Sequence, residues 1–188
     1  MQDIYIAPVN LTNRELVQRV IAELSRILSI KIRIIDLNLD LDNSFSAERN
    51  QYYSTQIIAE TVNHTSDING KIVVIVDFDL YIPVFTFVFG EAQLNGKHSV
   101  VSLCRLHEEF YTGQTNEELL FERTLKEVLH ELGHNFGLLH CNNWDCVMHS
   151  SSIIEEVDIK GNTYCSECRK SLPLNNKNGF RFWLNLHS

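Results

Sequence analysis

The sequence predicts an α/β (α+β) fold in which helices flank a mixed five-stranded sheet with one antiparallel edge strand. Three observations predict it. Apolar segments of strand length alternate with segments of helical periodicity in the first half of the chain, a hairpin signal follows them, and a long amphipathic segment follows the hairpin. With 188 residues and 44% apolar content, the chain is long enough to form one compact domain with a substantial core.

The first half of the chain has a strand–helix–strand–helix–strand order. We expect strands at 4–9, 30–35 and 72–77 and helices at 13–28 and 47–64. The first helix has apolar residues at helical spacing: Leu16, Val17, Val20, Ile21, Leu24 and Leu28. We expect the acidic, Asn-rich stretch 36–50 to be a loop leading into the second helix. Two crossovers of this kind predict a largely parallel sheet with right-handed connections.

A hairpin is expected next. Segments 85–94 and 98–103 flank Asn95-Gly96, which is a strong signal for a two-residue turn between antiparallel strands. One strand of the sheet is therefore predicted to run antiparallel. Gly90, inside the first segment, could mark a bulge or a close approach of another backbone. Cys104 directly follows the second segment and fits a buried strand end better than a reactive thiol.

A long helix is predicted to follow. Thr115 can cap its first turn, with Glu118 closing a capping box, and Gly137 can end it. A stripe of apolar residues along it is typical of a core-facing helix: Leu125, Val128, Leu129, Leu132 and Phe136. The helix and the residues just beyond it contain the string HELGHNFGLLH at 130–140. A core helix with incidental histidines is the competing interpretation, but one helix can be both core element and ligand platform.

Segment 130–140 supplies three imidazoles and one carboxylate at the spacing that hydrolytic zinc chemistry requires. His130 and His134 are one helical turn apart, so both can bind one ion. Gly137 lets the chain turn back, so that His140 can bind the same ion. Glu131 is rotated by about 100° and can serve as general base for a water in the open fourth position of a tetrahedral zinc.

Four of the five cysteines form a second group of candidate ligands: Cys141, Cys146, Cys165 and Cys168. Four thiolates suggest a closed structural zinc site. Two disulfides in an oxidising compartment are the alternative. Because the first residues lack the basic start and apolar run of a signal peptide, we expect a cytoplasmic protein whose cysteines hold metal.

The string HELGHNFGLLHC, followed by Cys146-Val147-Met148, resembles the archaemetzincins, a branch of the metzincin metallopeptidases. The resemblance extends from the candidate strand at Phe85 to Cys168. It implies a metzincin-like fold and assigns roles to individual residues. Catalytic zinc would be bound by His130, His134 and His140, Glu131 would be the base, Met148 would lie in a methionine turn below the metal, and Cys141, Cys146, Cys165 and Cys168 would bind a second, structural zinc.

Three neighbouring residues refine this comparison. Astacin-like metzincins have a tyrosine two residues after the turn methionine, where this chain has Ser150, so we assign no tyrosine to the oxyanion. Met148 is expected to form an apolar floor rather than a ligand, because a thioether binds zinc poorly beside three imidazoles. His149 is expected to form a hydrogen bond or face solvent.

The sequence thus predicts a zinc-dependent metallopeptidase with two zinc ions, in which Glu131 activates a zinc-bound water that attacks the peptide bond. By analogy with metzincins, a peptide or protein substrate would pair with the edge strand at Phe85–Ala92; an ordinary edge strand covered by a loop is the alternative. Two other functions stay open, namely a zinc-containing peptide-binding or regulatory module with little turnover, and hydrolysis of a non-peptide amide.

Domain organisation and charge complete the prediction. We expect one metallopeptidase domain over 1–188, with an N-terminal subdomain over 1–137 that ends in the active-site helix. A C-terminal subdomain over 138–188 would hold the methionine turn and the cysteine site. The net charge of −8 and the scattered Lys and Arg residues argue against a nucleic-acid partner. No segment is long and apolar enough to cross a membrane.

Overall fold

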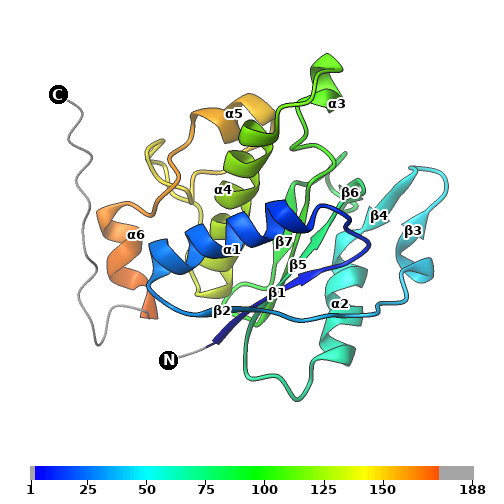
Figure 1. Cartoon of the computed structure of the whole chain (residues 1–188), viewed down its shortest axis with the longest axis horizontal. Coiled ribbons are helices and arrows are strands. Elements are labelled where there is room, and N and C mark those ends of the chain that lie inside the picture. Colours follow the sequence, from blue (N-terminus) through cyan, green and yellow to red (C-terminus); the bar gives the residue numbers. More distant parts are fainter. Residues whose placement is uncertain (1–2, 174–188) are drawn as a thin grey trace.

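The computed structural model describes residues 3–173, and a mixed five-stranded sheet forms its centre (Figure 1). Its strands are β1 (Asp3–Pro8), β2 (Ile32–Ile34), β5 (Gly70–Val76), β7 (Gly90–Ala92) and β8 (His98–Ser102), in the order β2-β1-β5-β8-β7. The pairs β1–β2, β1–β5 and β5–β8 are parallel, whereas β7 pairs antiparallel with β8 at one edge. The predicted sheet with one antiparallel edge strand is confirmed.

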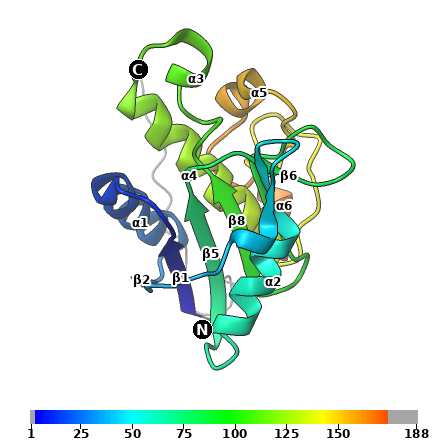
Figure 2. The same ribbon diagram turned by 90° about the vertical axis from the view of Figure 1, so that its right-hand side faces the viewer.

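Helices cover both faces of this sheet. In Figure 2, α1 (Arg14–Leu28) and α4 (Glu117–Asn135) lie on one side of the strands and α2 (Ser54–His64) lies on the other. Successive residues of β5 face opposite sides, because side chains alternate along a strand. Ile75 packs with the α1 and α4 residues, whereas Val76 packs with the α2 residues. Every residue of β5 is buried, and its apolar run 72–76 is typical of a strand that is covered on both faces.

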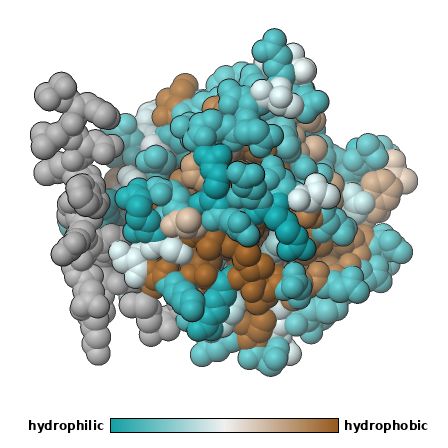
Figure 3. Space-filling view, viewed as in Figure 1, coloured by the Kyte–Doolittle hydropathy of each residue, from teal (hydrophilic) through white to brown (hydrophobic). Residues whose placement is uncertain are grey.

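Helix α1 is amphipathic, as predicted. Its N-cap is Asn13, whose Oδ1 accepts a hydrogen bond from Leu16 N at 3.0 Å, and it ends at Ser29 in a left-handed conformation. Its buried residues are Leu16, Val17, Val20, Leu24 and Leu28. Figure 3 shows that the surface over α1 is mostly hydrophilic, with hydrophobic residues gathered below the helix. Packing of the apolar side against the sheet therefore holds α1 in place.

The prediction of a helix over 47–64 is wrong at its beginning, because α2 starts at Ser54. Before it the chain forms a short 3-10 helix η1 (Asp42–Ser44) and the strands β3 (Phe45–Ser46) and β4 (Gln51–Tyr53). With β6 (Leu80–Tyr81), these strands form a second sheet, in the order β3-β4-β6. The Tyr52 ring packs against Phe45 and Phe78, with centroids 5.0 and 4.0 Å away, and this aromatic contact favours strands over helix here.

The hairpin also differs from its prediction. Only Gly90–Ala92 of the predicted strand 85–94 pairs with β8, because Val88 N donates to Leu80 O at 3.0 Å and leads the chain towards the second sheet. The turn is longer than two residues, since Gln93 and His98 still share a backbone hydrogen bond of 3.0 Å. Asn95, at φ 54°, gives its N–H to His134 O at 2.8 Å. The turn is thereby attached to the end of α4.

Helix α4 carries the histidine motif through the middle of the molecule. Its N-cap is Asn116, whose Oδ1 accepts from Leu119 N at 3.1 Å, and not Thr115 as predicted. An asparagine side chain reaches the free N–H groups of the first turn at least as well as a threonine. The helix ends at Phe136, directly before Gly137, close to the predicted end. All residues of the predicted apolar stripe are buried.

The chain after α4 has little regular structure within the described range. Two helices of six residues, α5 (Ile154–Ile159) and α6 (Ser166–Ser171), lie there, and α3 (Glu109–Thr112) precedes α4. Positions 174–188 of the predicted C-terminal subdomain lie outside the described residues. Within the described part, the helices are too short or too polar to cross a membrane.

Candidate metal centre and active site

The three histidines of the motif converge at one point. His130 and His134 extend from the last turns of α4, and their Nε2 atoms are 3.1 Å apart. The His140 ring centroid lies 5.3 Å from that of His130 and 4.9 Å from that of His134. One ligand atom from each of the three lies within 4.8 Å of the others. The predicted ligands are therefore brought together.

Hydrogen bonds fix the tautomer of two of these rings. His130 Nδ1 lies 2.8 Å from Val147 O, and His134 Nδ1 lies 2.8 Å from Leu138 O. A carbonyl oxygen only accepts, so each Nδ1 carries the proton and each Nε2 keeps its lone pair. Two lone pairs that face each other at 3.1 Å cannot form a hydrogen bond between neutral rings. The two lone pairs repel each other, and a cation bound between them would remove this repulsion. The donor set of three imidazoles fits zinc.

Burial keeps these rings neutral. It lowers the pKa of His130 well below the usual value, and the positive charge of Lys160 lowers it further. The pKa values of His134 and His140 are also lowered, again mainly by burial. Neutral imidazole is the form that binds a metal. The site is therefore ready to bind a cation at neutral pH.

Gly137 determines how His140 reaches the other two histidines. Its φ is +92°, a backbone conformation that residues with a β-carbon rarely adopt. Leu138 N then donates to Gly133 O at 2.9 Å, which closes the C-terminal turn of α4 and reverses the chain direction. The predicted role of Gly137 agrees with this geometry.

Glu131 lies in the same cavity, pressed against the edge strand. It is buried, and no described residue donates a hydrogen bond to its carboxylate. Burial raises its pKa well above the usual value, and the charge of Glu127 raises it further. A β-carbon on Gly90 would lie 2.6 Å from Glu131 Oε1. The same β-carbon would lie 2.9 Å from Val100 O, so Gly90 permits the close approach of a neighbouring backbone, as predicted, and of the Glu131 side chain as well.

Met148, which is predicted to form an apolar floor, packs against α4. The side chain is fully buried, and a β-carbon on Gly133 of α4 would lie 2.2 Å from its sulfur. The turn that carries Met148 also supplies Val147 O to His130. His149, next along the chain, stacks on Trp144 with ring centroids 3.7 Å apart and bonds to Ser150 O through Nδ1. Among the described residues, His149 does not belong to the group of converging ligand atoms.

Two site residues were missed by the sequence prediction. Glu127 of α4 and Lys160, just after α5, form a buried ion pair with Oε1 and Nζ 2.7 Å apart. Both line a cavity of about 720 Å³ that Glu131 and the three histidines also line. Glu127 could have been suspected, because it lies one helical turn before Glu131 on the same side of α4. Nothing near Lys160 in the sequence identifies it.

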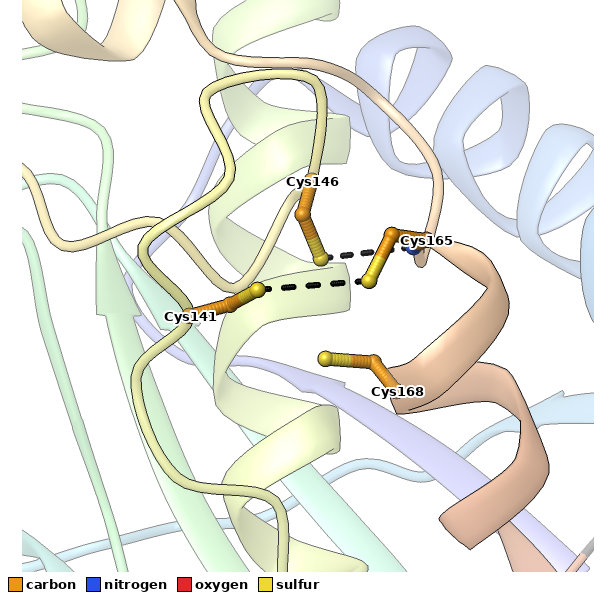
Figure 4. Close-up of side chains that lie close together, drawn as sticks. All are labelled: Cys141, Cys146, Cys165 and Cys168. Atoms are coloured by element: carbon orange, nitrogen blue, oxygen red, sulfur yellow. Dashed lines mark hydrogen bonds between the residues drawn. The ribbon is translucent and has the colours of Figure 1, made fainter.

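The four predicted cysteines also converge (Figure 4). Cys141 Sγ and Cys165 Sγ are 3.9 Å apart, and all four sulfur atoms lie within 4.8 Å of one another. Sulfur atoms bound tetrahedrally to zinc at ~2.3 Å would be ~3.8 Å apart. The cysteines are free thiols. Four sulfurs around one centre fit a metal better than the alternative of two disulfides, which would bring sulfurs together in pairs.

The thiols of the cluster differ in acidity, because burial raises the pKa of Cys146 and of Cys168, whereas hydrogen bonds lower that of Cys165. A hydrogen bond from the backbone of Cys168 lowers the pKa of Cys165 to about 7, so that its thiolate is accessible near neutral pH. The backbone also joins the cluster to the histidine site, since Cys141 N donates to Met148 O at 2.9 Å. Cys104, by contrast, has its pKa raised to about 11 by burial and is half-buried after β8, as expected for an unreactive thiol.

Comparison with known proteins gives one consistent result. Residues 11–173 match the model of peptidase family M54. The chain is similar to an archaemetzincin of Pyrococcus horikoshii, with 46% identity over 133 residues that cover 70% of this chain and 71% of the relative.

Solved structures agree. A zinc-dependent peptidase from Methanocorpusculum labreanum matches with a TM-score of 0.80 and 30% identity, covering 92% of this chain and 100% of its own. The archaemetzincin of Archaeoglobus fulgidus, solved in complex with malonate, matches with a TM-score of 0.78 and 31% identity, covering 91% of this chain and 100% of its own. The chain therefore belongs to peptidase family M54, and with it to the archaemetzincins.

Proposed function

We propose that this protein, which is a zinc-dependent metallopeptidase by family, hydrolyses peptide bonds at the histidine site with Glu131 as its general base. His130, His134 and His140 would hold the catalytic zinc. The single observation that carries the proposal is the geometry of α4, because two imidazole lone pairs converge beside a buried carboxylate that has no other hydrogen-bond donor among the described residues.

Each residue of the site has a separate task. Zinc, when bound, supplies a Lewis acid that makes a water nucleophilic and polarises the substrate carbonyl. Glu131 accepts the proton of that water and later gives it to the leaving amine. Burial supports this, since a raised pKa brings the carboxyl closer to the working pH of a base that must also act as an acid. Val147 and Leu138 orient two of the ligands through their carbonyls.

We also propose that a second zinc binds Cys141, Cys146, Cys165 and Cys168. The 3.9 Å separation of two of the sulfur atoms supports this ligand set. It would stiffen the loop that carries His140, because Cys141 directly follows that ligand. A reducing compartment such as the cytoplasm would keep the thiolates available. We propose a division into two subdomains at Gly137 for a related reason, because the part of the chain beyond α4 would depend on this zinc for its stability.

A peptide substrate is proposed to lie along the edge strand around Phe85–Ala92. Residues throughout this segment line the cavity, and β7 has a sheet neighbour, β8, on only one side. An extended peptide could add to the free side through backbone hydrogen bonds. The regular part of the edge is short, however, because only Gly90–Ala92 has strand geometry. Backbone pairing would therefore extend over few residues.

The proposal is tested by incubating the zinc-loaded protein and its Glu131→Gln variant with a mixture of synthetic peptides of varied sequence. We expect cleavage by the wild type and a rate at least about 100-fold lower for the variant, with zinc content unchanged in both. Zinc binding without cleavage of any peptide would favour the peptide-binding or regulatory module. Full activity of the variant would contradict the role of Glu131.

A further inference from the structure

The environment of Lys160 is unusual for a lysine, because the side chain is buried. Its side chain is only 1% exposed, and its ammonium group forms an ion pair with Glu127, whose side chain is 4% exposed. Lysine is almost never fully buried unless it is paired. A buried ion pair adds little to stability compared with apolar side chains of the same volume, because both charges lose their hydration. Stability alone therefore does not account for this pair.

The backbone around Lys160 is held firmly in place. Lys126 Nζ of α4 donates to Val157 O at 2.9 Å and to Asp158 O at 2.7 Å, which fixes the end of α5. On the other side, Gly161 N donates to Trp144 O at 2.9 Å, and a β-carbon on Gly161 would lie 2.1 Å from Asp145 O. The ammonium group is thus positioned before any ligand arrives.

The ammonium group also has unused hydrogen-bonding capacity. A lysine has three N–H donors, and among the described residues only Glu127 accepts one of them. Lys160 lines the same cavity as Glu131 and the three histidines. The remaining donors are therefore available to a group bound in that cavity.

Lys160 is the one strong positive charge in the cavity wall. Among the described residues that line the cavity it is the only lysine or arginine, and there is no tyrosine. Its charge reaches the whole site, since it lowers the pKa values of His130, His134 and His140. The pKa of Glu131 is lowered by the same charge, against the larger effect of burial.

We propose that Lys160 is a further catalytic residue, which donates a hydrogen bond to the carbonyl oxygen of the scissile peptide bond. The inference rests on the proposed function. When water attacks, its oxygen bonds to the carbonyl carbon, the π electron pair moves to the carbonyl oxygen, and Glu131 takes the proton. When the C–N bond breaks, an electron pair of this oxygen re-forms the C=O bond, and the C–N electron pair leaves with the amine, which receives that proton from Glu131. Lys160 keeps its own proton and stabilises the negative charge on oxygen between these two steps.

The matched variants are Glu127→Gln, Lys160→Met and the double variant with both changes. Glu127→Gln keeps the cation, whereas the double variant removes the ion pair without leaving a buried charge unpaired. Lys160→Arg keeps the positive charge but places it at a different position in the cavity. Each protein is loaded with zinc, its zinc content and melting temperature are recorded, and calorimetry measures binding of a phosphinic pseudo-dipeptide. This probe has a tetrahedral, anionic centre where the peptide bond would be.

For binding of the phosphinate, the double variant is compared with Glu127→Gln, because both lack the Glu127 carboxylate, and Lys160→Met is compared with the wild type. Lys160→Met and the double variant should bind it about 100-fold more weakly, with Lys160→Arg in between. On any peptide that the wild type cleaves, the loss should fall on kcat and leave KM nearly unchanged. If the ion pair were purely structural, its removal would lower the melting temperature. In that case kcat and phosphinate affinity would be the same in Glu127→Gln and in the double variant.

The outcomes separate this inference from the proposed function. Phosphinate affinity in the double variant equal to that in Glu127→Gln, at equal zinc content, would overturn the role of Lys160 and leave the peptidase mechanism standing. A zinc-loaded wild type that binds no phosphinate and cleaves no peptide would overturn the proposed function, and this inference with it.

Discussion

At Gly90 the edge strand β7 passes so close to α4 that a β-carbon would lie 2.6 Å from Glu131 Oε1 and 2.9 Å from Val100 O. The second contact is with backbone and cannot easily yield, so the Glu131 carboxylate has to move. We predict that Gly90→Ala lowers kcat/KM by roughly 10- to 100-fold, as expected for a small misplacement of a catalytic group. Zinc content should not change, because the histidines are not touched. Wild-type activity in Gly90→Ala would show that the carboxylate has more freedom than we infer.

The buried histidines lead to a prediction about pH. All three have their pKa values lowered from the usual 6.5, mainly by burial, so the neutral, metal-binding form persists below that pH. Protons should therefore compete with zinc only under more acidic conditions. We expect zinc at the histidine site to be constant from about pH 8 to about pH 6.5 and to be lost at lower pH. Elemental analysis of the wild type after dialysis at each pH measures this, with His134→Ala treated in the same way to subtract the zinc held by the cysteines. Loss that begins above pH 7 would contradict it.

At the scale of elements, the loop after α4 joins the two sets of ligands. Cys141 follows His140, its N–H binds Met148 O, and the neighbouring Val147 O orients His130. We predict that Cys165→Ser lowers both the melting temperature and the zinc content of the histidine site, because the loop loses the metal that fixes it. Thermal unfolding and elemental analysis check the two effects. An unchanged melting temperature with full zinc at the histidines would mean that the two sites are independent.

Helix α4 also holds α5 through a buried arginine. Arg123 is 3% exposed and binds Asp158 through two N–H groups at 2.7 Å each. We predict that Arg123→Ala lowers the free energy of unfolding by about 3 kcal/mol, because it leaves Asp158 and Leu106 O without their donor. Arg19→Ala is the control, since the Arg19–Glu118 pair to the same helix is exposed and should contribute less than about 1 kcal/mol. Equal losses in denaturant unfolding would contradict the contrast.

Across the whole molecule, features set by local spacing could be predicted from the sequence. The parallel strands, helix α1 and the buried stripe of α4 follow from periodicity, and the histidine and cysteine spacings identify the groups that the structure brings together. The beginning of α2 and the length of the edge strand could not be predicted in this way. Both depend on the second sheet, whose strands are only two or three residues long and are held by aromatic packing.

Lys160 shows the same limit at the site. It meets Glu127 across 33 positions of sequence, and its place depends on how α5 ends and how Gly161 fits against Asp145. No motif in the sequence encodes such a contact. The site residues that could not be predicted from the sequence are therefore those whose role arises from long-range packing. The predicted metal ligands, by contrast, lie close enough in sequence to form a motif.

Two separate zinc sites are the basis of the proposed function, and elemental analysis of the purified protein tests for both of them. We predict two zinc ions per chain in the wild type and one in His134→Ala, which breaks the histidine set and leaves the cysteines intact. Cys165→Ser should lose the cysteine zinc and part of the other. A wild type with one zinc or none and with its cysteines oxidised to disulfides would contradict the presence of two zinc sites. So would a His134→Ala variant with the full wild-type zinc content.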